Sequence, residues 1–113
     1  MRVISQNGTM DFSYEISTIF IHPRNGNVIE IQSAGDSEIS IIARYSSREK
    51  ALKAMEMLRE QYKRLETLKL YTKGSREDIR EILTLDELGC TILKTRKLSV
   101  FQFPKDDEIE VRV

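Results

Sequence analysis

The chain has 113 residues, and its 18 Lys and Arg are balanced by 18 Asp and Glu, so the formal net charge is zero. This length predicts one domain over residues 1–113. Zero net charge disfavours bulk nucleic-acid binding, whose affinity comes mainly from neutralising phosphates. No apolar run approaches the roughly 20 residues that span a bilayer, and the N-terminus does not read as a signal peptide. The sequence therefore predicts a cytoplasmic protein with no membrane contact.

One Cys and one His remove most familiar catalytic and metal sites. Cys90 has no second Cys for an internal disulfide, and structural zinc needs four ligands, usually Cys or His. His22 stands before Pro23 without an evident orienting partner, so a structural role is favoured over a catalytic one. We therefore expect a protein that is not an enzyme and holds no metal or cofactor.

Short β-branched segments separated by turn residues fill the first part of the chain. Asn7-Gly8 and Asn25-Gly26 are typical of hairpin turns, because both residue types tolerate positive φ. The first 46 residues therefore predict an antiparallel meander with strands at 2–5, 9–12, 16–22, 28–33 and 39–45.

A helical pattern begins at residue 46. The sequence 46–49 (SSRE) matches a capping box, and an apolar stripe follows at helical spacing. The stripe consists of Ala51, Met55, Leu58, Tyr62 and Leu65, with Leu52 widening it. The helix should begin near Ser47 and reach at least Arg64. Its end stays open between Arg64 and Gly74, because residues 67–71 also alternate like a strand.

A shorter helix is expected from Ser75, and strand-like segments follow at 91–93, 98–103 and 109–113. The predicted fold class is therefore α+β: an antiparallel β-meander, a long helix, a shorter helix and C-terminal strands, with the helices on one face of the sheet.

Two features suggest a binding site, and each has a structural alternative. Residues 47–73 carry a local charge of plus four between flanks of minus two each, which suits an anionic ligand, an acidic partner or plain solvation. Phe101 and Phe103 share one strand face and either enter the core or stack a nucleobase, with Arg96 or Arg112 meeting phosphate. Arg24, in the second Asn-Gly turn, is a further candidate contact. The acidic run 106–108 suits a cation or, more simply, a solvated turn.

Three stretches resemble a family of small phage and prophage proteins of Firmicutes. They are residues 1–8 (MRVISQNG) with 11–15 (DFSYE), residues 45–59 (YSSREKALKAMEMLR), and residues 101–106 (FQFPKD). Together they cover roughly a third of the chain, and the middle stretch is the most specific. Ser13 stands where the family pattern has proline, a departure that touches only a turn.

The resemblance implies a phage accessory protein more firmly than any activity. A looser similarity, in size and element order, is to anti-Thoeris sponge proteins, which sequester cyclic ADP-ribose-type signals as homo-oligomers. The first hypothesis is therefore a non-catalytic, homo-oligomeric counter-defence protein that binds a small nucleotide-like host signal. The alternatives are a protein–protein inhibitor of a host target, of the anti-CRISPR type, and a structural phage component.

Overall fold

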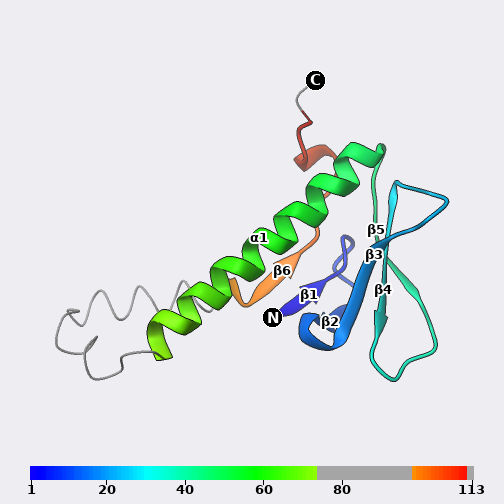
Figure 1. The fold of residues 1–113 in the computed structure, drawn as a ribbon. Coiled ribbons are helices and arrows are strands. Elements are labelled where there is room, and N and C mark those ends of the chain that lie inside the picture. The colour runs from blue at the N-terminus through cyan, green and yellow to red at the C-terminus, as the bar shows by residue number, and fades with distance from the viewer. Residues whose placement is uncertain (74–97, 112–113) are drawn as a thin grey trace.

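The computed structural model describes residues 1–73 and 98–111 (Figure 1). These residues form two three-stranded sheets and one long helix, which confirms the α+β fold class. The elements in chain order are β1 (Arg2–Ile4), β2 (Asp11–Ser13), the 3-10 turn η1 (Tyr14–Ile16), β3 (Ser17–Ile21), β4 (Val28–Ser33), β5 (Ser40–Arg44), α1 (Arg48–Lys73), β6 (Val100–Gln102) and the 3-10 turn η2 (Asp106–Glu108).

The strands divide into two sheets. Sheet A has the order β2-β1-β6, in which β1 is antiparallel to β2 and parallel to β6. Sheet B has the order β3-β4-β5 and is antiparallel throughout. The single meander expected over the first 46 residues is therefore interrupted. The turn η1 separates β2 from β3, and the free side of β1 takes its partner from the other end of the chain.

The two Asn-Gly pairs have different roles: the first forms a tight turn, as predicted, and the second contacts α1. Gly8 has a φ of +76°, which allows the tight connection between β1 and β2. Gly26 instead lies against α1, where an added Cβ would come within 3.1 Å of the Arg48 side chain. The second Asn-Gly pair therefore brings the β3–β4 turn close to the start of the helix.

The helix α1 begins one residue later than the predicted capping box requires. The Ser47 hydroxyl accepts a hydrogen bond from the Lys50 backbone N–H at 3.2 Å, so Ser47 is the capping residue. A capping box on Ser46 is therefore wrong, because Lys50 occupies the position that needs Glu or Gln. The strand-like alternation at 67–71 is overridden, since α1 continues to Lys73.

The buried face of α1 joins both sheets into one core. Ala51, Ala54, Met55 and Leu58 pack with Val3 of β1, Ile29 and Ile31 of β4, Ile42 of β5 and Phe101 of β6. Ala54, which is fully buried, completes this face. Leu52 does not widen it, because its side chain is 46% exposed on the other side of the helix.

The end of the described chain differs from the expected strand at 109–113. Residues 109–111 form no strand, and Ile109 follows η2 with its side chain in the core at 4% exposure. The buried Ile109 side chain anchors this segment in the core, although the segment pairs with no strand of the described residues. The predicted shorter helix from Ser75 and the strand at 91–93 lie outside the described residues.

Candidate functional site

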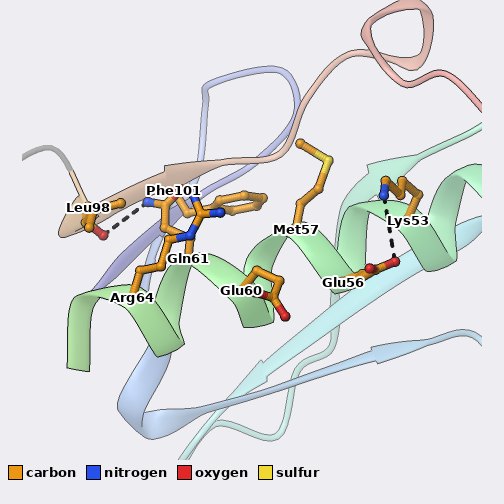
Figure 2. Close-up of a pocket in the computed structure, with 8 residues that line it drawn as sticks. All are labelled: Lys53, Glu56, Met57, Glu60, Gln61, Arg64, Leu98 and Phe101. Atoms are coloured by element: carbon orange, nitrogen blue, oxygen red, sulfur yellow. Dashed lines mark hydrogen bonds and ion pairs between the residues drawn. The ribbon is translucent and has the colours of Figure 1, made fainter. Parts of the chain in front are cut away.

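A concavity lined on one side by Phe101 lies between α1 and the chain entering β6 (Figure 2). We call it the α1–β6 groove, and its volume is about 310 Å³. Its lining residues are Lys53, Glu56, Met57, Glu60, Gln61, Arg64, Leu98 and Phe101. This volume is at the lower end of the range typical of ligand pockets, roughly 300–1,000 Å³.

Gln61 fixes the geometry of the groove. Its side-chain amide donates a hydrogen bond to the backbone carbonyl of Leu98 at 3.0 Å (Figure 2). It donates a second hydrogen bond to the backbone carbonyl of Val100 at 2.8 Å. These two bonds attach the strand that carries Phe101 to the helix. The groove is therefore held at a set width by a side chain of α1.

A second hollow continues the groove along α1. It has a volume of about 640 Å³, shares Lys53 and Glu56 with the groove, and is bordered by Glu49, Leu52, Glu110 and Val111. Together the two hollows form a continuous surface that we call the α1 strip. Along the helix it extends from Glu49 to Arg64, a rise of about 22 Å.

The α1 strip is acidic, although the helix as a whole is basic. Among the described residues, its charged side chains are the cations Lys53 and Arg64 and the carboxylates Glu49, Glu56, Glu60 and Glu110. Lys53 lies 3.9 Å from Glu56, while Arg64 makes no ion pair among the described residues. The plus-four balance of residues 47–73 therefore does not create an anion site here. Arg59 and Lys63, which contribute to it, are not among the lining residues.

Only one of the two aromatic residues predicted to contact a ligand lines the groove. Phe101 lines the α1–β6 groove but is only 5% exposed, and Phe103 is 1% exposed within the core. Their rings meet edge to face at a centroid distance of 5.2 Å and an angle of 86°. Of the two predicted alternatives, core packing and base stacking, the pair therefore adopts core packing, and Phe101 alone reaches the groove.

Of the three predicted arginines, the structure describes only Arg24, and Arg24 does not line the groove. Arg24 is exposed in the β3–β4 turn and is not among the lining residues, while Arg96 and Arg112 lie outside the described residues. Arg64 and Lys53 take the cationic places instead. The sequence pattern that could have predicted them is the helical spacing of residues 53, 57, 60 and 64, which places these four side chains on one flank of the buried stripe.

His22 has orienting partners that the sequence did not reveal. Its Nδ1 atom accepts hydrogen bonds from the backbone N–H groups of Arg24 at 3.1 Å and Asn25 at 3.0 Å. Its Nε2 atom lies 3.6 Å from a Glu30 carboxylate oxygen. Nδ1 therefore holds the β3–β4 turn, while Nε2 faces Glu30 of β4 beyond hydrogen-bond distance.

The acidic run 106–108 contributes a structural contact, in which Asp106 binds Ser46 and Lys50 at the start of α1; we call this contact the Asp106 clasp. The Asp106 carboxylate accepts hydrogen bonds from the Ser46 backbone N–H at 2.7 Å and from Lys50 Nζ at 3.2 Å. The bond from the Ser46 backbone is the largest cause that lowers the pKa of Asp106 below its ordinary value. In residues 1–73 and 98–111, no group of three or more His, Cys, Asp or Glu is placed to hold a metal ion.

The described helix also lacks the length of apolar sequence needed to cross a bilayer. Comparison with protein-family models, with curated proteins and with solved structures finds no match to this chain.

Proposed function

We propose that this protein is a non-catalytic binding protein whose α1 strip docks a basic amphipathic segment of another protein. The observation that carries the proposal is the combination of four carboxylates with apolar side chains on one elongated surface. Leu52 and Met57 are 46% and 38% exposed there, and Val111 is 37% exposed. An amphipathic segment would cover these apolar groups while its Lys or Arg side chains meet the carboxylates.

Two observations support binding in preference to catalysis and a protein segment in preference to a nucleotide. The Nδ1 atom of His22 accepts from two backbone N–H groups of the β3–β4 turn, and His22 is not among the residues that line the α1 strip. The excess of carboxylates in the α1 strip repels phosphate, whereas it attracts a cationic segment. The resemblance to phage proteins suggests a host protein as the source of that segment, as in an inhibitor of host defence.

The test uses two labelled peptides of one apolar pattern and opposite charge. The basic peptide repeats Lys-Leu-Leu-Lys-Lys-Leu-Leu, and the acidic peptide has Glu in place of each Lys. Fluorescence anisotropy with the full chain should show binding of the basic peptide only. The double substitution Glu56→Lys with Glu60→Lys should weaken that binding at least about tenfold, because two attractive contacts become repulsive.

Glu66→Lys is the matched control, since Glu66 lies on α1 outside the strip and pairs with Lys69 at 3.6 Å. It should leave the affinity within about twofold of wild type. Equal binding of the acidic peptide, or an equal loss of affinity in Glu66→Lys, would contradict docking at the α1 strip.

A second candidate function is the sequestration of a small nucleotide-like signal. It is favoured by Arg64, a cation without an ion pair among the described residues, in the same groove as one edge of Phe101 (Figure 2). Under this proposal, cyclic ADP-ribose or ADP raises the melting temperature of the wild type, Arg64→Glu abolishes the rise, and Arg59→Glu preserves it. No rise in the wild type at about 1 mM nucleotide would rule this candidate out.

A further inference from the structure

The two sheets have four edge strands, and three of them are covered or short. Gln6 covers β5, because its backbone N–H donates to the Ile42 carbonyl and its Oε1 atom accepts from the Arg44 N–H, both at 2.9 Å. Gln61 covers the carbonyls of Leu98 and Val100 beside β6. The edge strand β2 has only three residues. Such coverage is how proteins keep sheet edges from pairing with other chains.

The strand β3 is the exception. It has five residues and pairs with β4 on one side, and no described element pairs with its other side. Its sequence, STIFI, has no charged residue and no proline, the residues that commonly protect an exposed edge. Threonine, isoleucine and phenylalanine also favour strand pairing.

The hydrogen bonds at the two ends of β3 show which backbone groups face the free edge. Ala34 donates to Ile16 at 2.7 Å and His22 donates to Val28 at 2.9 Å, so even-numbered residues bond to β4. Backbone groups alternate sides along a strand. The N–H and C=O groups of Ile19 and Ile21 and the C=O of Ser17 therefore point to the free edge, while the Ser17 N–H donates to the Tyr14 carbonyl within η1.

We propose that β3 pairs with β3 of a second copy of this chain, antiparallel about a two-fold axis at Ile19. This register places Ile19 opposite Ile19, a pair that exchanges two backbone hydrogen bonds, and Ile21 opposite Ser17, where the Ile21 N–H donates to the Ser17 carbonyl. It joins the two copies of sheet B into one continuous sheet. Ile16, which is 58% exposed, then lies beside the end of the second strand near His22.

The charges at the two ends of β3 select the antiparallel arrangement. Glu15 precedes the strand and pairs with the N-terminal ammonium group of its own chain through Oε1. Arg24, exposed and without an ion pair among the described residues, follows the strand. Antiparallel pairing brings Arg24 of each copy toward the Glu15 carboxylate of the other. Parallel pairing would set Arg24 against Arg24, which is unfavourable.

The mass of the full chain in solution, measured by sedimentation over a range of concentrations, tests the pairing. The wild type should reach twice the chain mass of 13.1 kDa at about 100 μM. Arg24→Glu should raise the dimer dissociation constant at least about tenfold at low salt, because a carboxylate then faces Glu15 of the other copy. Arg44→Glu, the same charge change at the far side of sheet B, should leave the dimer unchanged.

Residue-resolved hydrogen exchange tests the register without any substitution. The amides of Ile19 and Ile21 should gain protection as concentration rises, while those of Thr18 and Phe20 should be protected throughout. The pairing is overturned by a monomer at about 100 μM, by a dimer as tight in Arg24→Glu as in wild type, or by Ile19 and Ile21 amides whose exchange does not change with concentration.

Discussion

Tyr45 shows how a single polar atom can hold distant parts of this chain together. Its hydroxyl donates to the Pro104 carbonyl at 2.8 Å, and the Gln6 side-chain amide donates to the same carbonyl at 3.2 Å. Burial of the Tyr45 ring, followed by the nearby charges of Asp106 and Glu108, raises the pKa of its hydroxyl above the ordinary value. The hydroxyl therefore stays protonated and remains a donor over the whole useful pH range.

Tyr45→Phe removes this one donor while keeping the buried ring. We expect the free energy of unfolding to fall by about 1 kcal/mol, the usual net contribution of one hydrogen bond. Urea unfolding with an unchanged dependence on denaturant would measure it. Tyr62→Phe is the control: its ring stacks on Tyr14 at 4.4 Å, but its hydroxyl has no hydrogen bond in the described residues. An equal loss in both variants would contradict the role of the Pro104 contact.

At the scale of elements, α1 shows which parts of a sequence pattern can be trusted. The spacing of Ala51, Met55, Leu58 and Leu65 identified the buried stripe, because each of these side chains is at most 6% exposed. Leu52 does not widen this stripe as predicted, because it lies about 100° around the helix from Ala51 and is 46% exposed. Helix geometry, rather than residue type, decides which leucine is buried.

Two leucines of α1 provide a matched pair that tests this distinction. Leu58→Ala should lower the free energy of unfolding by about 2–5 kcal/mol, because it leaves a cavity in the core at a side chain now 1% exposed. Leu52→Ala should change it by no more than about 0.5 kcal/mol, as is usual for exposed positions. Thermal and urea unfolding of both variants would measure the difference. Similar losses would mean that the two faces of α1 are wrongly assigned.

The strand pairings show where sequence patterns stop being informative. Local alternation and turn residues predicted the positions of β1 to β5 closely, since hairpin partners are neighbours in sequence. The parallel pairing of β1 with β6 depends on residues 98 positions apart, for example Val3 with Phe101, and no local pattern encodes it. The same applies to the α1–β6 groove, because its two walls come from different parts of the chain.

At the scale of the whole molecule, three carboxylates are stabilised in their charged form by folding. The pKa of Asp11 is lowered mainly by its hydrogen bond to Arg2, and that of Glu15 mainly by its hydrogen bond to the N-terminal ammonium group. The pKa of Asp106 is lowered mainly by the Ser46 backbone N–H. These contacts link β1 to β2, the N-terminus to η1, and the C-terminal segment to the start of α1.

A lowered folded-state pKa means that the unfolded chain binds more protons as the solution becomes acidic. The three groups therefore contribute stability above their ordinary values, 3.8 for Asp and 4.5 for Glu, and lose it as pH falls below them. Asp106→Asn should flatten the fall of melting temperature with decreasing pH in that window. Asp107→Asn, the same change at a residue with no hydrogen bond or ion pair in the described chain, should leave the slope unaltered. Identical slopes in the wild type and Asp106→Asn would contradict the clasp.

The parallel pair of β1 and β6 also governs when this protein can fold during its synthesis. Val3 is fully buried against residues that the ribosome makes almost a hundred codons later, including Phe101 and Phe103. Closing a loop of that length carries an entropic cost that local contacts cannot recover alone. The hairpins and α1 can form as they emerge, but the core closes only after the last strand leaves the exit tunnel. Until β6 has been translated, the backbone groups of β1 on the side away from β2 lack their native strand partner.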